Sequence, residues 1–211
     1  GSIIAAGPID KWRGRNVIAN TPPTVDQATL TAQPTLIANN LNFNPVVRFD
    51  GVNDQMSAGP MLSGYRYNGT SGLGSYTVYM VGRFDGAATT ILSHEDTTTP
   101  IRSTVSSAGI SSVNGGSTET LNASSAASGL QLRTYSYMPQ YVVPPVAPST
   151  TPTVYNGLFN TYVNGVIDAT TGTSLQTLPT ATGTFNVGGN AAGSQFFQGD
   201  LAEAVFYSYG P

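Results

Sequence analysis

The sequence predicts an all-β chain folded as a two-sheet antiparallel sandwich. Glycine, proline, threonine, serine and asparagine are abundant, and strand-like runs recur along the chain. Apolar residues with helical spacing occur only in short stretches, such as residues 24–30. Charged residues make up only 9% of the chain, while the hydrophobic fraction of 39% is sufficient for a core. We expect one domain over residues 1–211.

Two segments give the clearest local predictions. Residues 76–84 are β-branched and aromatic and are apolar on both faces for much of their length, which is typical of a central strand. Asn164-Gly165, between two strand-like runs, is the pair best suited to a two-residue hairpin turn. Further strands are expected at residues 46–49, 89–93, 184–187 and 202–207.

Two other segments differ from the strand pattern. Residues 139–152 contain five prolines, which cannot donate ladder hydrogen bonds, so we expect an extended surface loop there. A linker between two domains would have the same composition, but only about 60 residues follow it, which is few for a second core. Gly1-Ser2 resembles the remnant of an expression tag, so the chain is expected to be a module of a longer protein.

Charge and composition exclude several classes of function. The formal net charge is -3 and no basic run is present, so nucleic acid is not an expected partner. The absence of cysteine excludes disulfides, thiolate metal sites and cysteine nucleophiles. No apolar run approaches the roughly 20 residues of a membrane span, so membrane insertion is not expected.

The acidic residues do not have the spacing of a glycosidase pair, which requires two carboxyl groups about 5 to 5.5 Å apart. Glu119 and Glu203 are isolated, and Glu95 and Asp96 would point to opposite faces of a strand. The sole histidine, His94, has neither a Gly-x-Ser-x-Gly serine nor a zinc-type spacing around it, and we expect it in a polar loop after the strand 89–93. We therefore expect that the protein is not an enzyme.

Four segments follow one another in a recognisable order. Residues 41–56 contain Asn-Pro, an apolar strand, Phe-Asp-Gly and Asn-Asp; residues 76–84 form a long strand; residues 162–165 read Tyr-Val-Asn-Gly; and residues 187–207 contain Val-Gly-Gly and Phe-Gln-Gly-Asp-Leu-Ala-Glu. In this order they resemble LamG-like jelly-roll domains of the concanavalin A-like lectin and glucanase superfamily. The resemblance covers most of the chain from about Trp12 onward and implies a jelly-roll sandwich.

The stretch Asn-Phe-Asn-Pro-Val-Val at residues 42–47 is most similar to a subgroup of large secreted bacterial surface proteins, often adhesin-like. The resemblance implies a secreted or cell-surface module with neighbouring domains of a larger protein as partners. Trp12 is followed by Arg13-Gly14-Arg15-Asn16, where the subgroup usually has Asp, Ser, Gly and Asn. An aspartate-dependent role of that loop is therefore not expected here.

Asp50, Asn53 and Asp54 supply three side-chain oxygen donors within five residues. Such donors suit a hard cation, so calcium is the cofactor that the sequence would allow. An Asx-rich turn without a metal gives the same pattern, because Asp and Asn side chains cap turns through the backbone. Asp96 and Asp168 could complete a calcium site only if the fold brings them close.

Tyrosines are the candidate glycan contacts. Tyr65 and Tyr67 lie in a glycine-rich loop, whereas Tyr135 and Tyr137 alternate on a predicted strand and would project to the same side as a stacking platform. The alternative for these tyrosines is a place in the core or over a sheet.

Glu203 lies in a strand-like run with Leu201 and Val205 two residues away on either side. A shared face would bury the Glu203 carboxylate, which would then need a partner, and Arg48 on an early strand is the expected one.

The leading hypothesis is a non-catalytic ligand-binding module of a bacterial cell-surface adhesin, which binds a glycan or another surface ligand with or without calcium. A structural spacer in a larger surface protein is the second hypothesis. A glycan-active enzyme is the third, and the scarcity of acid and base groups disfavours it.

Overall fold

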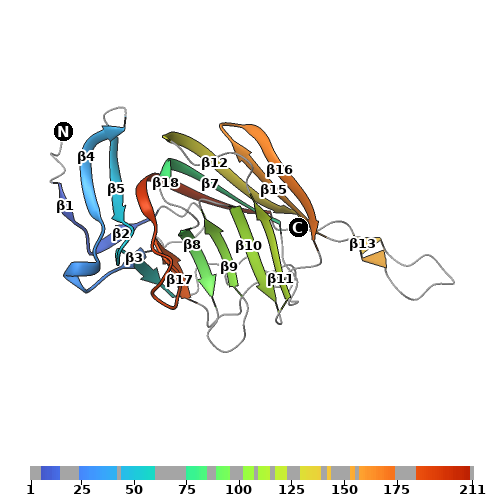
Figure 1. Ribbon diagram of the computed structural model, residues 1–211, viewed down its shortest axis with the longest axis horizontal. Coiled ribbons are helices and arrows are strands. Elements are labelled where there is room, and N and C mark those ends of the chain that lie inside the picture. The colour runs from blue at the N-terminus through green and yellow to red at the C-terminus, as the bar shows by residue number, and fades with distance from the viewer. Residues whose placement is uncertain are drawn as a thin grey trace.

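The computed structural model describes residues 6–14, 24–41, 44–59, 75–84, 89–95, 102–106, 109–114, 117–122, 129–138, 142–143, 153–154, 157–173 and 184–209. In these ranges the chain is built of strands, and helical structure is limited to the short 3₁₀ turn Leu30–Ala32. No helix in the described ranges is long and apolar enough to cross a membrane. Two antiparallel eight-stranded sheets form a jelly-roll sandwich (Figure 1), as the sequence predicted.

The first sheet has the strand order β1-β4-β5-β18-β7-β12-β15-β16. Its strands are β1 (Gly7–Pro8), β4 (Thr35–Leu41), β5 (Asn44–Asp50), β18 (Gln198–Tyr209), β7 (Ser75–Phe84), β12 (Leu130–Met138), β15 (Gly157–Val163) and β16 (Val166–Thr173). The last strand of the chain, β18, pairs with both β5 and β7. Early and late parts of the sequence therefore meet in the middle of this sheet.

The second sheet has the order β11-β10-β9-β8-β17-β6-β3-β2. Its strands are β11 (Ser117–Asn122), β10 (Gly109–Asn114), β9 (Arg102–Ser106), β8 (Thr90–Glu95), β17 (Thr184–Val187), β6 (Met56–Ala58), β3 (Thr24–Asp26) and β2 (Lys11–Arg13). The chain passes between the sheets from β5 to β6, from β7 to β8 and from β17 to β18. Neither sheet can therefore be completed from one continuous piece of sequence.

Both of the clearest local predictions are confirmed. β7 lies between β18 and β12, and its Val78, Met80 and Phe84 are at most 2% exposed. Asn164 and Gly165 form the turn between β15 and β16, with φ values of 52° and 81°. Positive φ at both turn positions is the geometry that matches the twist of a hairpin, which is why this pair is favoured there.

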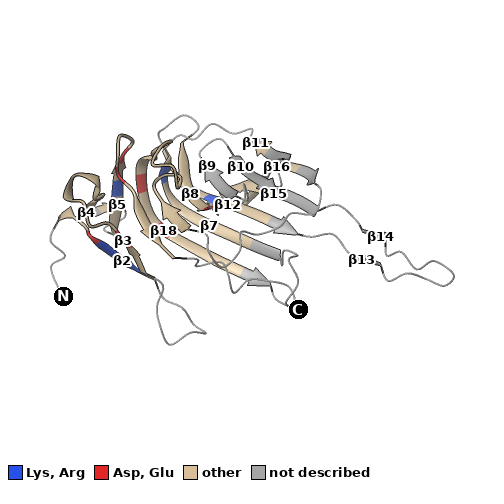
Figure 2. Cartoon of the chain, turned by 90° about the horizontal axis from the view of Figure 1, so that it is seen from below, with Lys and Arg blue, Asp and Glu red and all other residues tan. Residues whose placement is uncertain are grey.

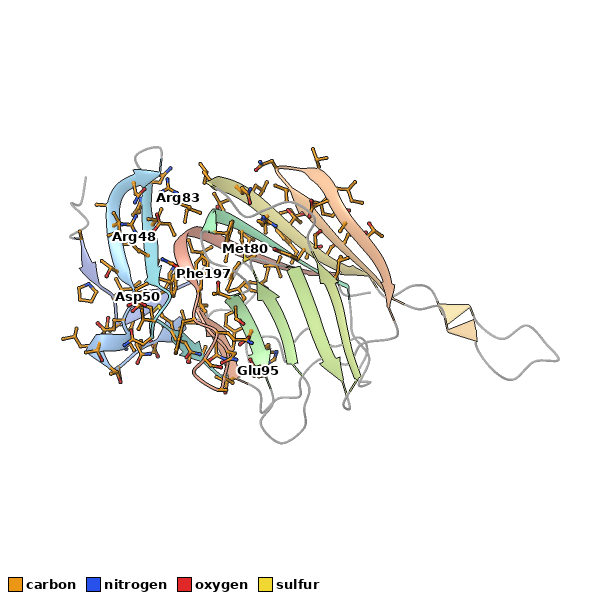
Figure 3. The ribbon with its side chains drawn as sticks, in the orientation of Figure 1. Arg48, Asp50, Met80, Arg83, Glu95 and Phe197 are labelled. Atoms are coloured by element: carbon orange, nitrogen blue, oxygen red, sulfur yellow. The ribbon has the colours of Figure 1, made fainter. Side chains whose placement is uncertain are left out.

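The core lies between the two sheets. Phe197 packs on Phe49, with ring centroids 5.6 Å apart, and on Phe84, with centroids 6.0 Å apart. Met56 from the second sheet is also fully buried in this cluster. Figure 3 shows Met80 and Phe197 between the sheets, whereas Arg48 and Arg83 lie toward the upper side of the molecule.

A β-bulge in β18 makes the prediction of a buried Glu203 wrong. Leu201 is opposite Gly82 on β7, but the next paired residue, Glu203, is opposite the adjacent Val81, so Ala202 is an extra residue in the ladder. An extra residue reverses the alternation of faces beyond it. Leu201 points into the core before the bulge, whereas Glu203 is exposed after it.

Arg48 pairs with Asp200 and not with Glu203 as predicted. The Arg48 Nε donates to Asp200 Oδ1 at 2.7 Å, and a terminal guanidinium nitrogen donates to Oδ2 at 2.9 Å. Asp200 lies directly opposite Arg48 on the neighbouring strand and its side chain is 3% exposed. The sequence pointed to the correct arginine, but the bulge gives the buried carboxylate to a different residue.

The structure describes parts of two further segments for which a loop was predicted. In the proline-rich segment, β13 (Val142–Val143) pairs with β14 (Thr153–Val154), which follows that segment, in a separate two-stranded sheet. The rest of residues 139–152 lies outside the described residues. His94 is in strand β8 and 1% exposed, not in a loop, since it shares the inward face of that strand with Leu92.

Candidate functional site

Tyr79 of β7 faces away from the core. Its neighbours along the strand, Val78 and Met80, are buried against the second sheet, and successive residues of a strand point to opposite faces. Across the sheet, Tyr79 is opposite Val205 of β18 and Thr134 of β12. Tyr79 therefore lies near the centre of the outer face of the first sheet, the face turned away from the second sheet.

Tyr162 of β15 extends the same row. It is opposite Thr134 of β12 on one side and Ile167 of β16 on the other, and Ile167 is 57% exposed. Two strand spacings separate Tyr79 from Tyr162, which places their backbones about 10 Å apart. Thr134 lies between the two rings and is only 7% exposed. The row thus presents two half-buried aromatic rings on either side of a small polar residue.

Tyr207 of β18 completes an aromatic group on this face. Its ring meets the Tyr79 ring edge-on, with centroids 5.8 Å apart and an interplanar angle of 90°. This arrangement is favoured by the aromatic quadrupole and fixes both ring orientations. Tyr207 is 53% exposed. We refer to Tyr79, Tyr162 and Tyr207 together as the tyrosine face.

A polar row lies beside the tyrosines, two residues farther along the strands. Thr77, Ser136, Asn160 and Thr170 are opposite one another on β7, β12, β15 and β16, and Thr77 is also opposite Tyr207. The Thr170 hydroxyl donates to Asn160 Oδ1 at 2.8 Å. This bond orients the Asn160 amide, which is 4% exposed, and leaves its Nδ2 as the donor side of the group.

Little charge is found near these residues. The described parts of β7 and β18 are mostly free of Lys, Arg, Asp and Glu (Figure 2). Arg83 and Glu203 are the exposed charges that follow the tyrosines on the outer face of these two strands. The outer face of β7 and β18 therefore exposes tyrosine rings and few charged side chains.

Tyr135, one of the two tyrosines of the expected platform, is not on this face. Tyr135 is opposite Val78, points inward and is 0% exposed, so its ring belongs to the core. Burial raises the pKa of Tyr135, and the neighbouring positive charge of Arg133 opposes that rise. The side chain of Tyr137 is outside the described part of β12, and Tyr65 and Tyr67 lie outside the described residues.

Sequence reasoning missed Tyr79 and Tyr162. The run 76–84 is apolar on both faces, so its pattern gave no signal for which side is outward. The neighbours of Tyr79 could have indicated its orientation. Val78 and Met80 share one face of the strand and are more hydrophobic than tyrosine, so that face is the better candidate for the core. Tyr162 precedes the Asn-Gly turn, which fixed its register but not its face.

Asp50, Asn53 and Asp54 lie close together in the turn between β5 and β6. Asp50 Oδ1 accepts the backbone N–H groups of Val52 at 2.8 Å and Asn53 at 3.3 Å. Asp54 Oδ2 accepts the Asp50 N–H at 2.9 Å. Burial, and secondarily the negative charge of Asp50, raises the pKa of Asp54 to about 6. The two hydrogen bonds to Asp50 Oδ1 have the pattern of an Asx turn.

Asp168, one of the two residues that could have completed a site at this turn, lies far from it. Asp168 is on β16, five strand spacings from β5 in the first sheet, which corresponds to about 24 Å. Asp96 lies outside the described residues. Within the ranges that the structure describes, no group of three or more His, Asp or Glu residues is arranged to hold a metal ion.

Neither a protein-family model nor a curated protein matches this sequence. Domain 4 of AbnA, a GH43 extracellular arabinanase from Geobacillus stearothermophilus, solved in complex with arabinotriose, is similar over 94% of this chain and 82% of its own, with 14% identity and a TM-score of 0.49. The crystal structure of HCR/D-Sa-GBL1/C is similar over 94% of this chain and 48% of its own, with 13% identity and a TM-score of 0.51. This second similarity supports the β-sandwich fold.

Proposed function

We propose that the chain is a non-catalytic glycan-binding module and that the tyrosine face is its binding site. The observation that carries this proposal is the grouping of Tyr79, Tyr162 and Tyr207 on one sheet face that carries little charge. The four ordered segments of the sequence further support a LamG-like module of a secreted bacterial surface protein.

The chemistry of a sugar ring fits this surface. One side of a pyranose ring is largely C–H, and it packs on an aromatic ring, while its hydroxyl groups take hydrogen bonds from amides and hydroxyls. Tyr79 and Tyr162 lie too far apart to stack on one ring. An oligosaccharide that crosses β7, β12 and β15 would stack one ring on Tyr79 and another on Tyr162 and pass over Thr134 between them.

Tyrosine also lowers the entropic cost of binding. Its side chain has two rotatable angles, and the edge-on contact between Tyr79 and Tyr207 already restricts both rings in the free protein. Less conformational freedom is therefore lost when a ligand binds. Rings that are ordered before binding therefore help a surface with little charge to bind a neutral ligand.

The experiment is a glycan array followed by titration calorimetry of the best neutral oligosaccharide. We expect Tyr207→Ala and Tyr162→Ala each to weaken binding at least tenfold, equivalent to about 1.4 kcal/mol. Leu30→Ala is the matched control, because Leu30 is 67% exposed on the 3₁₀ turn, away from this face. Unchanged far-UV circular dichroism and melting temperature would show that the variants are folded.

Two results would contradict the proposal. Equal affinity of both tyrosine variants and wild type would place the glycan elsewhere. No binding to any glycan would favour the structural spacer. The same array in calcium and in a chelator tests the proposal that calcium at Asp50, Asn53 and Asp54 assists binding, since only a calcium-assisted site loses affinity in the chelator.

A further inference from the structure

Arg83 stands on the same face as the tyrosines. It is four residues beyond Tyr79 on β7, so the two side chains leave the same side of the strand about 14 Å apart. Arg83 is exposed, and among the described residues no carboxylate lies within ion-pair distance of it. Among the residues that the structure describes, this end of the outer face therefore carries a guanidinium group that is not in an ion pair.

Asp200 is the nearest carboxylate across the sheet, and its charge is already compensated. It lies opposite both Arg48 on β5 and Arg83 on β7. Arg48 engages both of its oxygens, at 2.7 and 2.9 Å, and the Asp200 side chain is 3% exposed. In this bidentate pair, both carboxylate oxygens of Asp200 accept a hydrogen bond from the guanidinium group of Arg48. Arg83 consequently contributes a positive charge to this surface that Asp200 does not cancel.

The surface between Tyr79 and Arg83 is apolar on one side. Val81 lies between them on β7, and Leu132 and Leu130 are opposite Val81 and Arg83 on β12. Leu130 is 45% exposed. This strip continues the tyrosine face toward the guanidinium without a polar interruption on the β12 side.

The other side of Val81 carries the opposite charge. Glu203 of β18 is directly opposite Val81 and exposed. A carboxylate at this position repels an anion, so a negatively charged ligand that reaches Arg83 would have to lie over the β12 side of the strip. The pair Arg83 and Glu203 thus gives opposite expected effects on the same ligand.

We propose that the tyrosine face takes an acidic oligosaccharide, with a uronate carboxylate bound by Arg83 and its other rings stacked on the tyrosines. This inference rests on the proposed function and names its ligand class. A planar carboxylate accepts two parallel N–H bonds from a guanidinium, a match that an ammonium group lacks. The separation of Arg83 from Tyr79 requires a ligand of more than one sugar ring.

The test uses the full chain and a panel of oligogalacturonates, oligoglucuronates and oligomannuronates, each with its neutral methyl ester. Wild type is expected to bind at least one acid more tightly than its ester, with an advantage that decreases as salt rises. Arg83→Ala should weaken binding of that acid at least tenfold and leave the ester unchanged, and Arg83→Lys should restore the affinity only in part. Glu203→Gln should tighten the acid alone.

Lys11→Ala is the matched control, because Lys11 is an exposed cation on β2 of the other sheet. Equal affinity of every acid and its ester in wild type, or equal weakening by Arg83→Ala and Lys11→Ala, would overturn the inference. If Tyr207→Ala weakens acid and ester alike while Arg83→Ala changes neither, the glycan site stands and the acidic ligand class fails. If Tyr207→Ala changes neither as well, the proposed function fails.

Discussion

At the scale of single residues, Asp200 is the buried charge on which the centre of the first sheet depends. Its carboxylate accepts two hydrogen bonds from Arg48 and is shielded from solvent, whereas the Arg48 side chain is 47% exposed. Removal of the arginine would leave a buried carboxylate with fewer donors. The main cost of losing Arg48 is therefore the buried Asp200 carboxylate that remains without its partner, and the attraction between the two charges contributes less to stability.

We predict that a double-mutant cycle of Arg48→Ala and Asp200→Ala gives a coupling free energy of about 1 to 2 kcal/mol in urea unfolding. The partial exposure of Arg48 keeps this value below that of a fully buried pair. Glu203→Ala combined with Arg48→Ala serves as the control and should be additive within about 0.5 kcal/mol. Additivity in the Asp200 cycle, or coupling in the Glu203 cycle, would contradict the pairing described here.

Asp54 should make stability depend on pH. Its pKa is raised from 3.8 to about 6, chiefly by burial, so the folded state binds the proton more tightly than the unfolded state does. The contribution of this group is most favourable below about pH 4 and is lost as pH rises through about 6. Asp54→Asn, which keeps an oxygen acceptor for the Asp50 N–H, removes this loss.

The measurement is the urea midpoint of wild type and Asp54→Asn between pH 4 and pH 7. The variant should gain stability relative to wild type as pH rises from about 4 to 6, and the difference should level off above that. Carboxyl groups that do not interact with Asp54 affect both proteins alike and cancel in the difference. Two parallel pH profiles would show that Asp54 does not titrate in this range.

At the scale of elements, the bulge in β18 decides which residues of that strand reach solvent. Leu201 before it and Phe206 after it both contact the core, although they are five residues apart and a regular strand would place them on opposite faces. Val205 and Tyr207 are turned outward for the same reason. The extra residue at Ala202 therefore places Tyr207 on the same face as Tyr79 and Tyr162.

Gly82 of β7 lies opposite Leu201, next to this bulge. A Cβ atom at this position would run into the backbone carbonyl oxygen of Asp200, which cannot move like a flexible side chain. We predict that Gly82→Ala lowers the unfolding free energy by about 2 kcal/mol or more. Gly59→Ala is the control, because nothing lies within 4 Å of its added Cβ, and we expect a change within about 0.5 kcal/mol. Equal stability of the two variants would contradict close packing at the bulge.

At the scale of the whole molecule, packing of the two sheets determines the inside and the outside of each strand. Tyr135 and Tyr79 are both tyrosines on neighbouring central strands, yet one is fully buried and the other half-exposed. They differ in the face on which each stands, because Tyr135 is opposite Val78 and Tyr79 is opposite Thr134. A candidate ligand site on a sheet of this kind thus depends on register, which involves residues distant in sequence.

Much of the fold could be predicted from sequence. A β-branched and aromatic run indicated strand β7, and Asn164-Gly165 indicated the hairpin of β15 and β16, because both depend on local backbone preferences. The candidate site could not be predicted in the same way. His94 was expected in a loop and Glu203 in a buried position, and both expectations were wrong, whereas a glycan contact and a core position were both left open for Tyr135. Alternation along a strand gives two faces but does not say which one is buried, and it does not reveal a bulge.

The sequence by itself therefore determined the all-β class, the central strand and the hairpin turn, because short-range sterics and turn chemistry fix these features. Only the tertiary structure decided that Asp200 is the partner of Arg48, that Tyr135 is in the core and that Tyr79, Tyr162 and Tyr207 share an outer face. The reason is physical: these properties follow from the pairing of strands far apart in the chain, and a single bulge reverses every side chain beyond it.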